Sequence, residues 1–350
     1  MRLGLNIGYQ AAWTTPADHL TLAQEADRLG LSVVWAAEAY GSDSPTMLAW
    51  IAGQTSRIDV GAAVMQIPAR TPATTAMTAA TIDSLSGGRF RLGLGVSGPQ
   101  VSEGWHGVPF ASPLGRTREY VDIVRMALAR EPVSYHGKHY ELPLAGGAGK
   151  ALRLTLHPVR EHIPIYLAAI GPKNLELTGE IADGWLAIFF APEFADELLS
   201  PIRAGCARAG KSLDGFDVVA HAPLVIGDDI DACAALVRWY AALYVGGMGS
   251  RAQNFYNALA VRMGYADAAR EVQDLYLARR HQDAAAAVPM EFIDRTSLLG
   301  PVERVAARMR DYAAAGVTTL SVSLFVGDVD DGVRTLRAAA EAFDMSGVGE

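Results

Sequence analysis

The stretch LSGGRFRLGLG, residues 85–95, joins the end of a predicted helix to a predicted strand. The helix covers residues 73–85 and follows Thr71-Pro72, a pair that favours a helix start because proline is well suited to the first turn. The strand covers residues 90–96 and is nearly continuous in apolar character, which is typical of a strand buried on both faces. This unit predicts a parallel sheet whose strands are connected by helices.

The same unit recurs along the chain, where short apolar runs alternate with longer amphipathic stretches. The predicted strands cover residues 3–8, 32–37, 59–65, 90–96, 163–169, 184–189, 216–226 and 318–324. Gly30 and Gly316 follow two helical stretches, where a left-handed cap is expected. Eight β/α units predict an α/β fold, a TIM (β/α)8 barrel in a single domain of residues 1–350, because a doubly wound sheet would have to be unusually wide.

Three segments interrupt this alternation and are predicted insertions, at about residues 97–115, 131–162 and 245–300. Residues 133–142 alternate around Gly137 and predict a β-hairpin. The third segment is long, has helical periodicity and precedes the final β/α unit. Insertions of this length on a compact domain are typical of lids or partner surfaces.

The composition allows a large core, since 50% of the 350 residues are hydrophobic and 19% are charged. The formal net charge of −8, without a basic cluster, argues against nucleic acid as a partner. Cys206 and Cys233 are isolated and lack metal-ligand spacing, so we expect no metal site and a reducing, cytoplasmic location. Because no apolar run reaches the length of a membrane span, we expect no membrane partner.

The predicted strand ends carry small and apolar residues with few acids and bases. A TIM barrel gathers its active site at these carboxyl ends, so we expect a flat organic cofactor that supplies the reactivity toward a small-molecule substrate. Residues 93–98 match the GxGxxG pattern, but this strand is the fourth, and Pro99 follows with no helix expected there, which argues against a dinucleotide site. Gly95 is better explained by a close approach of its backbone to a ring or to another strand.

Residues 168–176 run from a strand end through Gly171 into a helix with Pro172 in its first turn. The free N–H groups and the positive dipole end of such a helix favour an anion, and Lys173 adds a positive charge. A phosphate site is one interpretation of this motif. A tight β/α turn without a ligand is the other, and the motif alone supports both equally.

Several motifs spread over the chain point to one superfamily. They are Val34-Trp35-Ala36-Ala37-Glu38, residues 85–95 leading into Ser97-Gly98, Glu103-Gly104-Trp105-His106-Gly107, residues 165–172, and Ile181-Ala182-Asp183-Gly184-Trp185. On these motifs the chain, from residue 3 to about residue 324, resembles the bacterial luciferase-like superfamily. More narrowly, it resembles the coenzyme F420-dependent oxidoreductases related to methylene-tetrahydromethanopterin reductase.

The resemblance implies a homodimer and coenzyme F420 as the cofactor, with FMN as the alternative. It also implies a non-prolyl cis peptide at the end of the third strand, near Ala63-Val64, which supports the cofactor ring from one face. Residues 95–98 would lie along the ring edge and residues 168–174 at the ribityl phosphate. The implied cofactor-binding residues are Glu38, Ala63, Val64, Gly95, Val96, Ser97, Gly98, Ala168, Ala169, Gly171, Pro172, Lys173 and Asn174.

This chain departs from the F420-dependent sugar-phosphate dehydrogenases of the superfamily. Those enzymes carry an Asp-His pair after the second strand and an acid after the fourth, whereas this chain has Glu38-Ala39 and Ser97-Gly98. We therefore expect hydride transfer between C5 of the deazaflavin and an activated C=C, C=N or C=O bond. Such a reaction needs mainly orientation and one proton donor.

The expected catalytic residues are the possible proton donors Glu38, His106 and His221, with Tyr9 as a further donor. Glu38 interrupts an apolar run, where an unpaired buried carboxylate is costly, and its alternative role is that of a structural hydrogen-bond anchor. The aromatic residues expected to line a substrate pocket are Tyr9, Trp13, Tyr40, Trp105 and Phe190. Two other functions stay open, an FMN-dependent monooxygenase that uses O2 and reduced flavin, and a non-catalytic flavin-binding protein.

Overall fold

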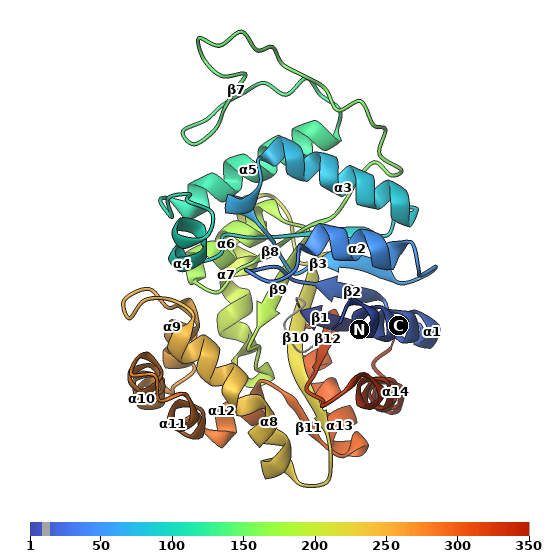
Figure 1. Ribbon diagram of the computed structural model, residues 1–350, viewed down its shortest axis with the longest axis vertical. Coiled ribbons are helices and arrows are strands. Elements are labelled where there is room, and N and C mark those ends of the chain that lie inside the picture. The colour runs from blue at the N-terminus through green and yellow to red at the C-terminus, as the bar shows by residue number, and fades with distance from the viewer. Residues whose placement is uncertain (9–14, 350) are drawn as a thin grey trace.

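The computed structural model describes residues 1–8 and 15–349, and in these residues eight parallel strands close into a barrel with helices outside it (Figure 1). Consecutive barrel strands pair side by side, and β12 pairs with β1 to complete the ring. The barrel strands are β1 (Arg2–Gly8), β2 (Val33–Ala36), β3 (Asp59–Ala62), β5 (Phe90–Gly95), β8 (Ile165–Ala168), β9 (Gly184–Ile188), β10 (Asp217–Ile226) and β12 (Thr319–Leu324). The predicted TIM barrel is confirmed, and each predicted strand overlaps one of these strands.

Two short strands extend the sheet beyond the barrel. β4 (Met65–Gln66) pairs with β5, and β11 (Leu298–Gly300) pairs with β10. The predicted strand over residues 59–65 is therefore divided into β3 and β4, because the chain bulges at residues 63 and 64 between them. β11 was not predicted, since three residues are too few to show a periodic pattern.

The helices around the barrel begin and end largely where the sequence predicts. Thr15 caps α1 in a capping box with Asp18, Thr71 caps α3, and Gly30 ends α1 with a φ angle of 81°. The surrounding helices are α1 (Pro16–Leu29), α2 (Ser44–Ala52), α3 (Pro72–Ser86), α5 (Pro113–Leu128), α6 (Pro172–Ile181), α7 (Ala195–Arg208), α8 (Ile230–Ala242), α13 (Val302–Ala314) and α14 (Val329–Ser346). In the residues that the structure describes, no helix combines the length and apolar character that a membrane span requires.

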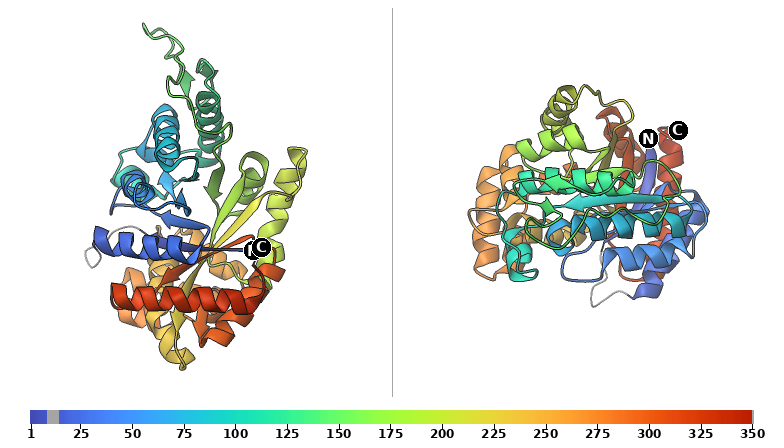
Figure 2. Two further views of the ribbon diagram at one scale, coloured as in Figure 1. Left: turned by 90° about the vertical axis from the view of Figure 1, so that its right-hand side faces the viewer. Right: turned by 90° about the horizontal axis from the view of Figure 1, so that it is seen from above.

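Residues outside these β/α units form an arm and a helical cluster. The arm contains the predicted hairpin, β6 (Tyr135–His136) and β7 (Glu141–Leu142), and extends beyond α3 and α5 (Figure 2). The helical cluster follows α8 and packs on it. It consists of the π-helical turn η3 (Leu243–Gly247), α9 (Phe255–Arg262), α10 (Ala266–Leu277), α11 (His281–Ala286) and α12 (Met290–Arg295).

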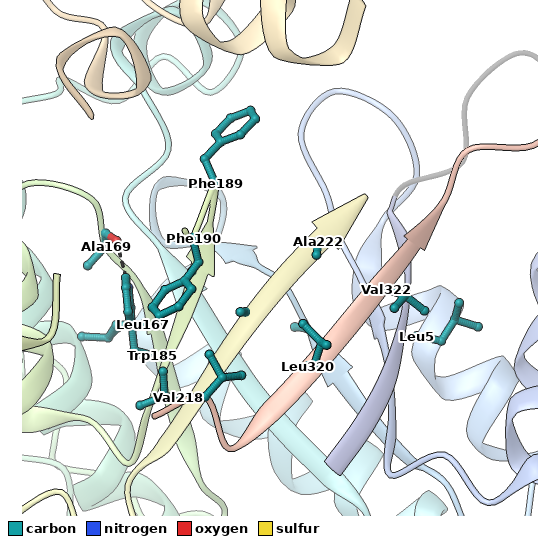
Figure 3. Packing of buried hydrophobic residues seen from close by; sticks show 14 of the residues in the cluster. Leu5, Leu167, Ala169, Trp185, Phe189, Phe190, Val218, Ala222, Leu320 and Val322 are labelled. Atoms are coloured by element: carbon teal, nitrogen blue, oxygen red, sulfur yellow. Dashed lines mark hydrogen bonds between the residues drawn. The ribbon is translucent and has the colours of Figure 1, made fainter. Parts of the chain in front are cut away.

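Two sets of buried side chains hold the barrel. The larger set lies between the strands and the helices, where Trp185 donates a hydrogen bond of 2.9 Å from Nε1 to the carbonyl oxygen of Ala169 (Figure 3). The smaller set, here called the interior cluster, consists of Val33, Trp35, Tyr166, Leu186 and Val219. At the amino ends of the strands, the carboxylate of Asp217 pairs with Arg91 and Arg2 and accepts a hydrogen bond from the Tyr166 hydroxyl. This charged network closes the end of the barrel opposite the expected active site.

Candidate active site

A chain bulge lies at the carboxyl ends of the barrel strands, here called the mouth. The peptide bond between Ala63 and Val64 is cis, at the position that the resemblance implied. The side chains of Ala63, Val64 and Ala168 are partly buried and pack on the interior cluster. The bulge therefore covers the barrel interior at the mouth.

Gly95 makes room for this bulge. A β-carbon on Gly95 would lie 2.5 Å from Cγ2 of Val64 and 3.8 Å from the β-carbon of Ala168. Since real β-carbons do not approach other atoms at 2.5 Å, a side chain at residue 95 would displace Val64. The close approach expected at Gly95 is therefore made by the side chain of Val64 in the bulge.

The segment after β5 differs from the prediction in one respect. A short helix, α4 (Pro99–Gly104), opens directly after Gly98, so the expectation that no helix begins there was wrong. Proline fits the first turn because its missing amide hydrogen has no partner to lose there. Ser97 turns the chain into this helix with a φ angle of 60°. The dinucleotide interpretation still does not hold, because β5 is the fourth strand of a closed barrel.

The carboxylate of Glu38 is held from several sides and is largely buried, with 8% of its side chain exposed. Arg70 binds both carboxylate oxygens, the amide of Gln66 donates to Oε1 at 2.9 Å, and the amide of Ser44 donates to Oε2 at 3.2 Å. Arg70 also pairs with Asp43. These contacts match the hydrogen-bond anchor that the sequence left as the alternative role of Glu38, because both of its carboxylate oxygens already accept hydrogen bonds.

His106 is connected to this anchor through the side chain of Gln66. Nε2 of His106 lies 2.7 Å from Oε1 of Gln66, and Nε2 of Gln66 donates to the carbonyl oxygen of Glu38 at 3.2 Å. Within residues 1–8 and 15–349, Nδ1 of His106 has no hydrogen-bond partner. Of the expected proton donors that the structure describes, His106 combines partial exposure with a free ring nitrogen.

His221, on β10, occupies a different environment. Its ring meets Trp35 edge to face at 5.9 Å between centroids. Both ring nitrogens are buried and lack a hydrogen-bond partner in the described part of the chain, as do Nε1 of Trp35 and Oγ of Ser321. Burial lowers the pKa of His221 to about 4, so this imidazole is neutral near pH 7.

The expected phosphate turn has an open side and a cation that the sequence did not predict. A β-carbon on Gly171 would meet nothing within 4 Å. Lys173 pairs with Glu176 at 2.9 Å, and 82% of its side chain is exposed. Arg262 on α9 instead donates a hydrogen bond of 2.9 Å to the carbonyl oxygen of Ile170. Sequence patterns gave no signal for this contact, because residues 170 and 262 are 92 positions apart.

The aromatic residues expected in a substrate pocket are found in three situations. Tyr9 and Trp13 lie outside the described residues. Tyr40 and Trp105 are 58% and 66% exposed. Phe190 is only 1% exposed and packs between Trp185 and Tyr312, so its assignment to a pocket wall requires correction. Because Tyr312 lies on α13, Phe190 fills the space between the barrel and that helix.

A buried aromatic cluster was missed by the sequence analysis. Phe189 has a φ angle of 52° and is turned away from Phe190 (Figure 3). Its ring packs against Tyr240, Tyr244, Tyr256 and Phe292, with centroids 5.5 to 6.4 Å apart. These partners come from α8 and from the helical cluster that follows it. The end of β9 therefore anchors that cluster to the barrel.

A (β/α)8 barrel gathers its active site at the carboxyl ends of its strands, and the small residues and the chain bulge at this mouth suit a bound organic cofactor that supplies the chemistry. Comparison with known proteins makes this expectation more specific. A family model described as luciferase-like monooxygenase matches residues 2–319, and the chain belongs to this family.

Two relatives are similar over most of their length. A Mycobacterium tuberculosis protein, named as a candidate coenzyme F420-dependent oxidoreductase, is 46% identical over 330 residues, which are 92% of this chain and 95% of that protein. The 5,10-methylenetetrahydromethanopterin reductase of Archaeoglobus fulgidus is 31% identical over 304 residues, 86% of this chain and 88% of that protein. The expected relation to F420-dependent oxidoreductases is confirmed.

A solved structure agrees in fold. The coenzyme F420-dependent tetrahydromethanopterin reductase from Methanopyrus kandleri superimposes with a TM-score of 0.81 at 24% sequence identity. The similarity covers 96% of this chain and 97% of that chain. This likeness supports the luciferase-like barrel.

The residues at the mouth fit a deazaflavin cofactor on two observations. The bulge at Val64, which the missing side chain of Gly95 makes room for, closes the barrel interior and leaves a surface at the mouth on which a flat ring could rest. The turn at Gly171 is open and has Arg262 beside it, which suits a phosphate group.

Proposed function

We propose that this chain is a coenzyme F420-dependent oxidoreductase that transfers a hydride between C5 of the deazaflavin and an activated C=C, C=N or C=O bond of a small organic molecule. The two relatives support the cofactor. The reaction type is supported by the geometry at the mouth.

The observation that carries the proposal is the division of roles between Glu38 and His106. Glu38 is held by Arg70 and two backbone amides, and therefore serves as an anchor. His106 has one ring nitrogen bonded to Gln66 and the other without a partner in the described residues. Among the described residues, His106 is thus the expected donor that is left available, which suits the reduction of a polarised double bond by one hydride and one proton.

The cofactor, when bound in its reduced form, supplies the hydride. The other contributions come from the protein. Val64 and Gly95 would form the floor for a flat ring, and the N-terminus of α6 together with Arg262 would hold the phosphate. His106 gives its proton to the substrate atom that gains electron density. The exposed aromatic side chains of Tyr40 and Trp105 contact the apolar part of the substrate.

Titration of the purified protein with F420 and, separately, with FMN tests the cofactor, with the fluorescence of each free cofactor as the signal. We expect tighter binding of F420. A preference for FMN together with oxygen consumption would instead indicate the monooxygenase. Binding of F420 without turnover on a panel of enones, imines and ketones would indicate a non-catalytic flavin-binding protein.

The assay for turnover follows the return of oxidised F420 absorbance when the reduced cofactor and a panel substrate are mixed with the enzyme. The His106→Gln variant should bind F420 normally and lose roughly 10²- to 10⁴-fold in kcat, the contribution typical of a general acid. Unchanged turnover in that variant would remove His106 from the mechanism.

A homodimer and a cytoplasmic location are also part of the proposal. Trp50 on α2 and Met77 and Leu85 on α3 are exposed by 39%, 58% and 62%, and the two helices are neighbours. Burial of these side chains against a second copy would remove a large apolar area from water. Light scattering should therefore show a dimer, and a monomer for the double variant Met77→Asp, Leu85→Asp. A monomeric wild-type protein would contradict the dimer.

A further inference from the structure

We propose that Gln66 fixes the tautomer of His106, so that Nε2 keeps its hydrogen and Nδ1 is the atom that gives the proton to the substrate. This inference rests on the proposed function for its chemical consequence. Its structural part concerns only residues of this chain. Gln66 is therefore a positioning residue, which acts through His106.

The orientation of the Gln66 amide follows from its partners. Its side chain lies 3.2 Å from the carbonyl oxygen of Glu38, which can only accept a hydrogen bond. The nitrogen of the Gln66 amide must therefore face Glu38, because the opposite orientation would place two acceptor oxygens together. The amide oxygen of Gln66 then faces the ring of His106 at 2.7 Å.

The hydrogen on His106 follows from the same reasoning. An amide oxygen accepts hydrogen bonds and cannot donate one, so Nε2 of His106 must carry a hydrogen. This holds for the neutral ring and for the imidazolium ion. The proton that comes and goes between these two states is consequently the one on Nδ1, and Nδ1 has no partner in the described part of the chain.

The side chain of Gln66 cannot rotate freely to pair with the other tautomer of His106. It is 5% exposed, and its backbone amide donates to Oε1 of Glu38. Glu38 is in turn held by Arg70, which also binds Asp43. His106 is fixed at its own end as well, since its backbone amide donates to the carbonyl oxygen of Val101 at 3.1 Å.

The position of Gln66 connects this arrangement with the cofactor floor. Gln66 follows Val64 by two residues and is the register partner of Gly95 in the pairing of β4 with β5. His106 is therefore one hydrogen bond away from the strand segment that forms the bulge.

A bound, reduced cofactor would supply a hydride, with both of its electrons, to one atom of the polarised double bond and would thereby be oxidised. The bond between Nδ1 of His106 and its proton breaks, and the proton joins the other substrate atom. The ring is left neutral with its hydrogen on Nε2 and regains the Nδ1 proton from solvent. If both tautomers of His106 were populated, Nε2 would lack its hydrogen in part of the molecules. Those molecules would lose the hydrogen bond from Nε2 of His106 to the Gln66 amide oxygen.

The tautomer can be read without cofactor or activity. Long-range ¹H–¹⁵N spectra of histidine-labelled protein, recorded at alkaline pH, distinguish Nε2–H from Nδ1–H. Comparison with the His106→Gln variant assigns the signal of His106 among the 8 histidines. We expect the Nε2–H form in the wild type. A dominant Nδ1–H form, or a mixture, would overturn the inference even if the enzyme is active.

The Gln66→Met variant keeps a side chain of similar length without hydrogen bonds. We expect a mixture of tautomers at His106 and a loss in kcat of about 10- to 100-fold, the range known for partners that orient metal-binding histidines, with little change in F420 binding. Unchanged tautomer and kcat would overturn the inference. If the wild type binds no F420 and turns over no substrate, the proposed function fails. The spectra of the wild type and of Gln66→Met then decide by themselves whether Gln66 fixes the tautomer of His106.

Discussion

Gly95 and Val64 share one space at the mouth, because a β-carbon on residue 95 would lie 2.5 Å from Cγ2 of Val64. Val64 belongs to the bulge between β3 and β4, and Gly95 ends β5, the strand with which β4 pairs. The shape of the proposed ring floor thus depends on the absence of one side chain.

The Gly95→Ala variant should displace Val64 and weaken F420 binding about tenfold or more, since an overpacked side chain typically costs about 1–3 kcal/mol. Gly327→Ala is the matched control, because a β-carbon there meets nothing within 4 Å. Fluorescence titration with F420 measures both. Equal affinity in the two variants would show that the bulge does not support the cofactor.

Arg262→Ala should weaken F420 binding by roughly 10- to 100-fold, because a hydrogen bond to a charged group contributes about 1.5–3 kcal/mol. Arg262 donates to the carbonyl oxygen of Ile170, directly before the N-terminus of α6, while Glu197 lies 4.0 Å from its Nε. The Lys173→Ala variant is the control and should bind normally, since Lys173 pairs with Glu176. If Lys173→Ala weakened F420 binding more than Arg262→Ala did, Lys173 and not Arg262 would be the residue that binds the phosphate.

The barrel could be predicted from the sequence because each strand is an apolar run between recognisable helix caps. Thr15, Thr71 and Gly30 act as the sequence indicates. The position of the cis peptide came from the resemblance, since the residues Ala63 and Val64 have no local property that demands it.

Other features depend on tertiary contacts that no local pattern shows. Gln66 and His106 are 40 residues apart, and their hydrogen bond exists only because β4 and the end of α4 meet. Phe189 and Phe190 are adjacent, but the φ angle of 52° at Phe189 breaks the alternation of a strand. Both rings are buried, but Phe190 packs against Trp185 and Tyr312 while Phe189 packs against the helical cluster, and the sequence could not tell which ring would take which place.

The Glu38→Gln variant should destabilise the fold by about 1–3 kcal/mol, because Arg70 loses its buried charged partner and keeps only the exposed Asp43. The side chains of Glu38 and Arg70 are 8% and 16% exposed. Asp267→Asn, in the exposed pair with Arg270, is the control and should cost less than about 1 kcal/mol. Urea unfolding measures both. Normal stability with a lost kcat would instead make Glu38 the proton donor.

His221 should make the stability of the protein depend on pH below neutrality. Burial lowers its pKa from 6.5 to about 4 in the folded state. Between these values the unfolded chain binds a proton that the folded chain does not, so the free energy of unfolding falls as the pH falls, by up to about 1.4 kcal/mol per pH unit. Above pH 6.5 and below about pH 4 this contribution is constant.

His221→Asn should remove that part of the slope in urea unfolding, whereas His19→Asn, at the other histidine whose pKa burial lowers, should leave it in place. Equal slopes in the wild type and His221→Asn would mean that the His221 ring is hydrated in solution.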